Sequence, residues 1–278
     1  VREGGAMSQA AQLASGWLSR AWSWVSDLRA SLPLASALSA SQARLALGLI
    51  ATVPIGWAQR AVPRGPARHA YGAGATAALL TFCYGRDAWQ FAGASALVWA
   101  LMRLFPTKCG RLAWATIFTY QVYLHYARAS EAAWNAGDVD FTGSFMMLVL
   151  KLVSVAQDYE DGCRGRKTEH SFDSMPSLLE FAGYVGAFGG VMTGPHCFFD
   201  DYLRYSNSQG EWALLDTPDF PGTTRAALGA LSWAALTGAL HFKILTAVPD
   251  RVAALTDGSM TFAHRLVESP NPPPLPSP

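Results

Sequence analysis

The chain has 278 residues, of which 51% are hydrophobic and 15% charged, and its net charge is +1. Soluble domains carry about 25% charged residues, so the composition argues against an ordinary soluble protein. The near-neutral charge and the absence of a basic stripe give no reason to expect a nucleic-acid partner.

The first predicted element covers residues 11–32, where apolar residues recur at steps of three and four, as in an amphipathic helix. Trp22 and Trp24 flank its apolar face, and tryptophan favours the boundary between water and lipid. We assign residues 1–43 to an N-terminal segment whose helix lies in the membrane surface. The alternative is an amphipathic helix that packs on the rest of the protein.

Beyond Arg44 the sequence consists of apolar blocks separated by short polar stretches. Crossing a bilayer takes about 20 residues, and several blocks are at or below that length, so the prediction rests on their succession. We expect an all-α, polytopic transmembrane helical bundle with about seven spans over residues 44–248. The blocks are Leu45–Gln59, His69–Gly85, Ala88–Met102, Leu112–Ala127, Phe141–Gln157 (interrupted by Lys151), Phe181–Phe199 and Ala226–Phe242.

Charge in the linkers supports the same organisation. The linkers after the first, third and fifth blocks each carry three basic residues, and those after the second and fourth carry one. Basic linkers prefer the cytosolic side, so we expect the chain to enter its first span from the lumenal side. Residues 249–278 form a divergent, proline-rich tail that cannot continue a helix and is expected to be disordered or extended.

An ordered series of short motifs follows the fourth block: WNAGDVD at 134–140, Thr142-Gly143, Leu150-Lys151-Leu152, DYEDG at 158–162, MPSLLE at 175–180, Gly183-Tyr184, Gly189-Gly190, Gly194-Pro195 and Asp201-Tyr202. In this order and spacing the series resembles the lysophospholipid acyltransferases of the membrane-bound O-acyltransferase family, most closely the plant and algal lysophosphatidylcholine type. The resemblance spans roughly residues 42–248 and corresponds to the front half of a typical member.

The resemblance implies a helical bundle around a chamber in the endoplasmic reticulum membrane. There an acyl group would pass from acyl-CoA, the co-substrate, to the free hydroxyl of a lysophospholipid during phospholipid remodelling. It implies membrane lipids, lysophospholipid and acyl-CoA as partners. No bound cofactor and no metal are expected, and the four cysteines show no metal-like spacing.

The same resemblance assigns no catalytic residue to this chain. The family uses a histidine as general base and an asparagine amide, both from downstream motifs. The sequence contains no WHG, and its asparagines, Asn135, Asn207 and Asn271, lie in predicted loops or in the tail. We therefore expect a fragment that lacks the catalytic half and is inactive alone.

Five residues of the recognised segments are candidates for lining the chamber: Lys151, Glu180, Gly194, Pro195 and His196. The stem of Lys151 either extends along the bundle toward water or presents a cation to coenzyme A phosphates. Glu180 either forms an S-x-x-E capping box with Ser177 or makes a polar contact inside the bundle.

The remaining polar residues have less specific interpretations. We expect His69, His170 and His264 to be solvated at span ends or in loops, and Asp158 to be solvated at a helix end. His241 lies near the end of the seventh block and is expected to be structural. The alternative function is a non-enzymatic multi-span membrane protein, a transporter or assembly partner, although the paired halves of transporters are not visible.

Overall fold

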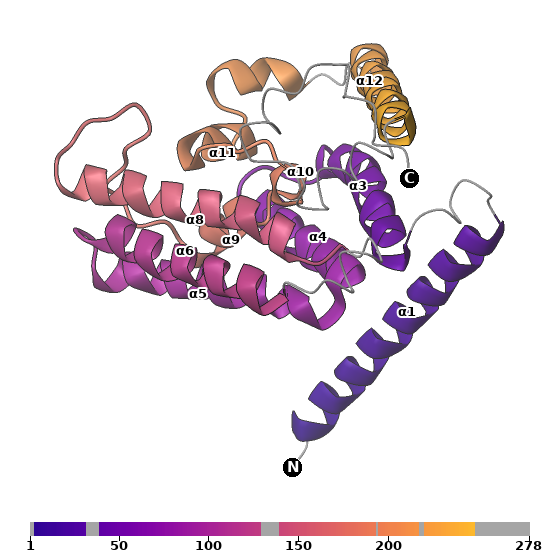
Figure 1. The fold of residues 1–278 in the computed structure, drawn as a ribbon. Helices are drawn as coiled ribbons and strands as arrows, with labels where there is room; N and C mark the ends of the chain where they lie inside the picture. Colours follow the sequence, from indigo (N-terminus) through magenta and orange to yellow (C-terminus); the bar gives the residue numbers. More distant parts are fainter. Residues whose placement is uncertain (1–2, 32–38, 129–138, 193, 217–219, 248–278) are drawn as a thin grey trace, which may run out of the picture. The chain divides into compact units, whose positions relative to one another are not determined.

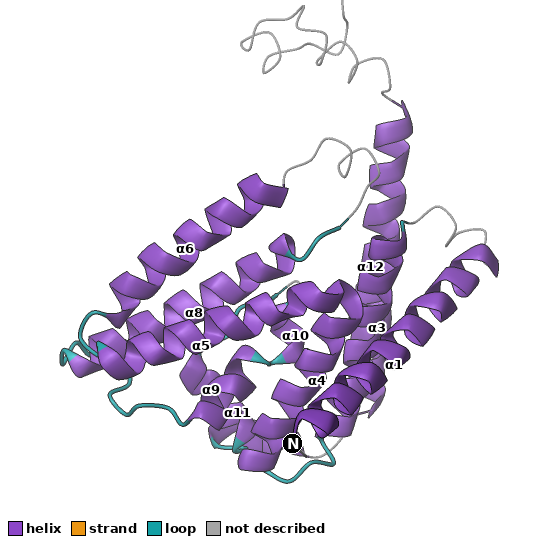
Figure 2. Cartoon of the chain, turned by 90° about the horizontal axis from the view of Figure 1, so that it is seen from below, coloured by secondary structure: helices purple, strands orange, loops and turns teal. Residues whose placement is uncertain are grey.

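The computed structural model describes residues 3–31, 39–128, 139–192, 194–216 and 220–247. Over these residues the regular structure consists of α-helices and two short 3₁₀ helices, with no strand (Figures 1 and 2). The predicted all-α class is therefore confirmed. The chain divides into two compact units, Val1–Asp216 and Thr217–Pro278. The predicted tail, with His264, lies outside the described residues.

The first unit begins with α1 (Glu3–Ser31), α3 (Ala40–Gln59) and α4 (Pro66–Tyr84). The indole Nε1 of Trp22 donates a hydrogen bond to the carbonyl of Phe82 (2.8 Å), and Val25 is buried. The C-terminal part of α1 thus packs on the body of the unit, and its position in the membrane surface stays a prediction.

Three long helices follow and lie side by side (Figure 1). They are α5 (Trp89–Leu104), preceded by the 3₁₀ helix η1 (Gly85–Ala88), then α6 (Cys109–Arg128) and α8 (Thr142–Cys163). Apolar residues of all three, among them Val98, Ile117 and Leu148, form the core. At Gly110 a Cβ atom would lie 2.8 Å from the Cα of Gln157, so glycine allows α6 to approach α8 closely.

The sixth apolar block does not form one helix. It is divided among α9 (Leu178–Val185), the four-residue α10 (Phe188–Val191) and irregular chain, and α11 (Phe199–Ser206) begins at its last residue. The 3₁₀ helix η2 (Gly210–Asp216) ends the unit. The expectation of a single helical span over Phe181–Phe199 is therefore wrong. Glycines weaken a helix and proline removes a donor, and this block contains five glycines and Pro195.

The second unit contains α12 (Phe220–Ala247), which covers the seventh block. None of the helices in the described part of the chain combines the length with the apolar character that crossing a membrane requires. The count of seven spans thus remains a prediction.

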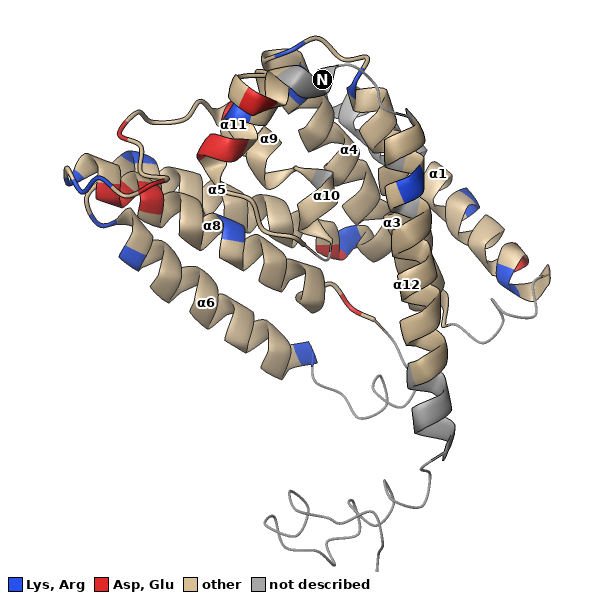
Figure 3. Ribbon diagram, turned by 90° about the horizontal axis from the view of Figure 1, so that it is seen from above, with Lys and Arg blue, Asp and Glu red and all other residues tan. Residues whose placement is uncertain are grey.

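The first unit combines exposed apolar side chains with two buried charges. Apolar side chains of α6 one turn apart, Trp114, Phe118 and Val122, are 57%, 47% and 54% exposed, whereas Lys151 and Glu160 are 0% and 1% exposed. Charged residues gather near helix ends and in loops, leaving long uncharged stretches on α5 and α6 (Figure 3). On α8, Lys151 lies in the middle of the helix. Such apolar outer faces mark contact with an apolar environment or a partner.

Candidate functional site

A cavity of about 340 Å³ lies among α3, α4, α9, α10, α11 and the irregular chain between α10 and α11. We call it the α9–α11 cavity. Its wall contains many residues of the motif series that the sequence analysis recognised, and it is mainly apolar. The residues from that series are Gly183, Gly189, Gly190, Pro195, Asp201 and Tyr202. A concave, largely apolar site with a few polar groups is the usual form of a small-molecule site.

Glycines of this series shape the wall because a side chain would not fit. A Cβ at Gly183 would lie 2.8 Å from the Cα of His69, and one at Gly190 would lie 2.7 Å from the carbonyl oxygen of Pro195. The motif glycines therefore allow α9 to pack directly on the backbone of α4 and α10 to pack against the irregular segment that contains Pro195.

The polar part of the wall comes from α11 and α3, and His69 of α4 contacts it from outside the lining. The hydroxyl of Tyr202 lies 2.7 Å from Nδ1 of His69, and the hydroxyl of Tyr205 donates to Oε1 of Gln59 (3.2 Å). His69 is 2% exposed, so its predicted solvation is wrong: the close packing of α9 covers it. A histidine fixed in this way orients the Tyr202 hydroxyl at the cavity wall.

Lys151 lies behind the wall rather than in water. Its ammonium donates to the carbonyl of Tyr184 (2.8 Å) and approaches that of Val185 (3.4 Å), with Nζ 5.0 Å from the Tyr184 ring centroid. The interpretation that its stem reaches solvent is therefore wrong. These carbonyls end α9, where the helix dipole is negative, so the C-terminus of α9 supplies the counter-charge.

Tyr184 links this support to the cavity. Its hydroxyl donates to the carbonyl of Cys197 (3.1 Å) and lies 3.3 Å from that of Lys151, and the side chain is fully buried. Cys197 and Gly190 both line the cavity, and a Cβ on Gly190 would lie 3.8 Å from the Lys151 ammonium. Lys151 and Tyr184 thus connect α8, α9 and the chain after α10.

The other candidate residues have different positions. Ser177 Oγ accepts from the Glu180 amide (3.2 Å), and Glu180 Oε2 accepts from the Ser177 amide (2.9 Å). The predicted capping box is confirmed, and the hydrogen bond from Ser177 holds the pKa of the Glu180 carboxyl below its usual value. Gly194 has φ +89°, a conformation that favours glycine. Among the described residues the buried Nε2 of His196 has no hydrogen-bond partner.

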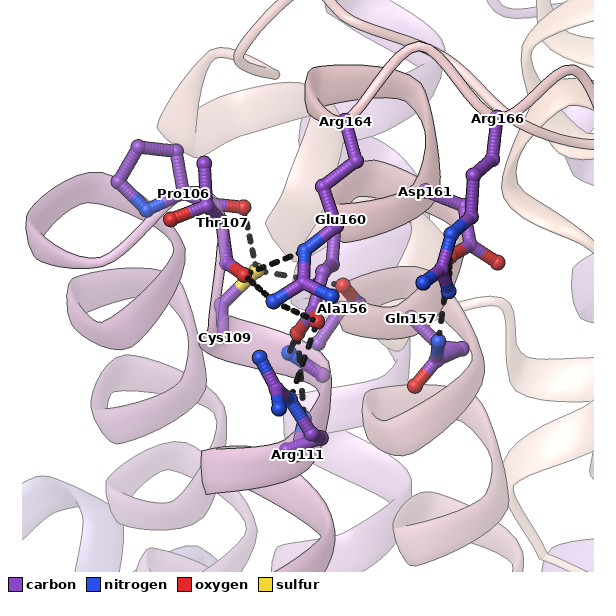
Figure 4. A network of polar contacts seen from close by, with 11 residues as sticks. Pro106, Thr107, Cys109, Arg111, Ala156, Gln157, Glu160, Asp161, Arg164 and Arg166 are labelled. Carbon is purple, nitrogen blue, oxygen red and sulfur yellow. Dashed lines mark hydrogen bonds and ion pairs between the residues drawn. The ribbon is translucent and has the colours of Figure 1, made fainter.

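A second polar network lies at the other end of α8 (Figure 4). Glu160 accepts from the backbone amides of Gly110 (2.9 Å) and Arg111 (3.3 Å) at the start of α6. Its other oxygen pairs with Arg164 (3.0 Å) and with the Arg111 side chain (3.3 Å), and Arg164 also donates to the Thr107 carbonyl. The DYEDG motif therefore supplies a tertiary cap for α6.

Acidic groups and a histidine meet near the cavity. Nδ1 of His170 lies 2.9 Å from Asp200, which also pairs with Arg204 (3.3 Å). Potential ligand atoms of His170, Asp200 and Asp201 all lie within 4.8 Å of one another, a spacing that a metal ion accepts. Burial raises the pKa of the nearby Asp158 carboxyl to about 6. His170 and Asp158, predicted to be solvated, are half-buried, because the loop after α8 folds back; nothing local in the sequence indicates this.

The comparisons with known proteins follow the same residues. A profile of the MBOAT, membrane-bound O-acyltransferase family, matches residues 126–261. Lysophospholipid acyltransferase 1 of Arabidopsis thaliana is 30% identical over 220 residues, 76% of this chain and 47% of that protein. Lysophospholipid acyltransferase 2 of the same plant is 29% identical over the same shares, and Lysophospholipid acyltransferase 6 of Drosophila melanogaster is 28% identical over 54% of this chain and 22% of that protein.

The chain spans about half the length of the curated relatives that it matches. The residues matched by the family profile include the motif residues that line the α9–α11 cavity. Residues 126–261 therefore form a domain of the membrane-bound O-acyltransferase family, within a chain similar to lysophospholipid acyltransferases over 220 residues.

Proposed function

We propose that this chain forms part of an acyltransferase that moves an acyl group from acyl-CoA to a lysophospholipid of the lysophosphatidylcholine type, in the endoplasmic reticulum membrane. The observation that carries the proposal is the convergence of the family's motif residues on one cavity. Names of the relatives support the reaction class.

The polarity of the first unit supports the proposed membrane setting. Its outer stripe on α6 is apolar and its buried interior contains charges and amides, the arrangement expected of a bundle in lipid. The proposed spans are the seven apolar blocks, with the sixth broken around Gly194-Pro195. Broken helices at membrane depth are tolerated where they line a cavity, and the irregular chain there lines the α9–α11 cavity.

In the proposed reaction the lysophospholipid hydroxyl oxygen attacks the thioester carbonyl carbon. An ester C–O bond forms, the C–S bond breaks, and the hydroxyl proton ends on the thiol of coenzyme A. The chain would contribute the apolar wall that holds an acyl chain and the Tyr202 hydroxyl, oriented by His69, as a positioning group. We assign the general base to no residue of this chain, since the family's histidine motif is not in its sequence.

The test uses a fusion of residues 1–248 to the back half of Lysophospholipid acyltransferase 1 from Arabidopsis thaliana, expressed in membranes beside the chain alone. The fusion is expected to transfer labelled acyl groups from acyl-CoA to lysophosphatidylcholine, and the chain alone is not. Tyr202→Phe in the fusion should lower the rate about tenfold, equivalent to about 1.4 kcal/mol. The exposed Tyr126→Phe should leave it unchanged.

Two outcomes would count against the proposal. A fusion that folds but transfers no acyl group would contradict the assigned reaction. Solute transport by the reconstituted chain would favour the non-enzymatic alternative.

A further inference from the structure

A second and larger cavity, of about 560 Å³, lies among α4, η1, α5 and α9. We call it the α4–α5 groove. The groove and the α9–α11 cavity lie on different sides of the α9–α10 segment. Phe181, Val185 and Val191 line the groove, whereas Gly183 and Gly190 line the cavity. The groove is therefore a separate site behind the wall of the candidate active site.

The interior of the groove offers a ligand only hydrocarbon contacts. Its lining is almost entirely apolar, and its three hydroxyl groups are already bonded to backbone carbonyls. Thr76 donates to Gly186, Thr81 to Ala77 and Ser95 to Phe91, each at 2.6 Å. An occupant with polar groups inside the groove would leave them without partners, at a cost in free energy, so the shape and chemistry suit an alkyl chain.

The rim of the groove has the opposite character. Arg86 is the charged residue of the lining, and the adjacent Trp89 is 64% exposed. The nearest carboxylate along the chain, Asp87, is paired with Arg128 at 2.8 Å. Arg44 stacks on Trp22 at 4.4 Å, and a Cβ on Gly85 in the lining would lie 2.9 Å from that indole. Positive charge therefore exceeds negative charge around the rim.

We propose that the α4–α5 groove binds an anionic phospholipid, with one acyl chain in the groove and the phosphate on Arg86. A guanidinium binds phosphate through paired hydrogen bonds, and an exposed tryptophan is typical of the level at which lipid head groups lie. The lipid would pack against the face of α9 opposite the cavity. The proposal requires contact with lipid but does not depend on acyl transfer, because this lipid is not consumed.

The experiment uses the full chain purified in detergent and a phosphatidylglycerol that carries a photoactivatable diazirine on one acyl chain. After irradiation, mass spectrometry locates the labelled peptides. We expect label on α4 and α5. Arg86→Gln should lower labelling at equal probe concentration by roughly tenfold, and Ala92→Phe, which places a ring in the groove, should lower it comparably.

Matched controls separate this site from lipid that merely surrounds the protein. Arg103→Gln, at the far end of α5, and Ala115→Phe, on the exposed side of α6, lie outside the groove lining and should leave labelling unchanged. A diacylglycerol probe without phosphate should label wild type and Arg86→Gln equally weakly. Circular dichroism and the thermal midpoint show that each variant is folded.

Three results would overturn the proposal. Label spread evenly over α6 and α5 would indicate unspecific surrounding lipid. Labelling that persists in both groove variants would exclude the groove. A cross-link from the groove to a second polypeptide would show that a protein covers it.

Discussion

Helix α8 contains two fully buried charges of opposite sign, Lys151 and Glu160, and the two are satisfied in different ways. Lys151 faces the C-terminal carbonyls of α9, whereas Glu160 faces the N-terminal amides of α6. Each charge therefore meets the helix end whose dipole has the opposite sign. The comparison teaches that the ends of neighbouring helices can replace charged partners inside a bundle.

The difference between the two sites lies in access to solvent. Glu160 also pairs with Arg111, whose side chain is 63% exposed, and with Arg164, which is 25% exposed. Those arginines can be hydrated again if the carboxylate is removed. Among the described residues, Lys151 contacts the two carbonyls and the Tyr184 ring, which are buried or half-buried. We therefore expect the Lys151 site to be the less tolerant of the two.

The largest effect is expected from reversing the charge at Lys151. Lys151→Glu places a buried carboxylate against two carbonyl oxygens and should lower the free energy of unfolding by about 3–5 kcal/mol. Lys151→Met keeps the length and removes the donor, so its loss should be smaller, about 1–3 kcal/mol. Denaturant titration in detergent micelles measures both. The exposed Lys167→Glu is the control, and equal midpoints for Lys151→Glu and wild type would contradict the assignment.

At the opposite end of α8, Glu160→Gln removes the charge and keeps the shape. Hydrogen bonds to charged groups contribute more to stability than neutral ones. We therefore expect the free energy of unfolding to fall by about 2 kcal/mol. Arg111→Gln should cost about 0.5 kcal/mol or less, because its pair is open to solvent. The same titration compares them. If Arg111→Gln were as damaging as Glu160→Gln, the ion pair rather than the capping of α6 would dominate.

The support that Lys151 gives to the cavity wall can be probed through two adjacent glycines. Gly190→Ala would place a Cβ 2.7 Å from the Pro195 carbonyl and close to the ammonium, whereas at Gly189 no atom lies within 4 Å of a Cβ. We expect Gly190→Ala to lower the free energy of unfolding by about 1–2 kcal/mol through overpacking, and Gly189→Ala to leave it unchanged. Thermal midpoints of the two variants, measured side by side, test this. Equal midpoints would show that the cavity wall rearranges to accept the extra Cβ atom.

The smallest expected effect is a pH dependence beside the Glu160 site. The folded pKa of Asp158, about 6, exceeds its unfolded value near 4, so the folded state binds the extra proton between these values. This group's contribution to stability is present below about pH 4 and is lost as the pH rises through about 6. Asp158→Asn should remove this decrease in stability with pH. At neutral pH its free energy of unfolding should exceed that of wild type by about 1 kcal/mol. Thermal unfolding of wild type and Asp158→Asn from acid to neutral pH tests the sign of this effect. A parallel decrease of both thermal midpoints with pH would contradict it.

Much of the helical framework was predictable because its signals are local. Apolar blocks separated by polar linkers correspond to α3, α4, α5, α6, α8 and α12, and the S-x-x-E pattern at Ser177 and Glu180 forms the capping box it predicts. The break in the sixth block was also present as a local signal, since glycines and Pro195 interrupt it. The apolar composition of this block predicts a single helix, and its glycines and proline prevent one.

The partners of buried polar groups were not predictable. The sequence predicts a solvated His69 and, in one of two interpretations, a Lys151 that reaches water, yet both side chains are buried. Their surroundings depend on α9 and α11, which follow them by more than twenty residues in the sequence. The two cavities also depend on how α9 packs on α4. Of the six motif residues that line the α9–α11 cavity, only Pro195 is among the chamber residues that the sequence predicts.

The amino-acid sequence by itself determined that this protein is helical, where most of its long helices run and which family its motifs resemble, because hydrophobic runs, capping residues and motif order are properties of neighbouring residues. Only the tertiary structure decided which helix end faces Lys151, which amides Glu160 caps and which glycines allow helices to touch. These depend on distances between segments far apart in the chain, and such distances are fixed by packing rather than by local preference.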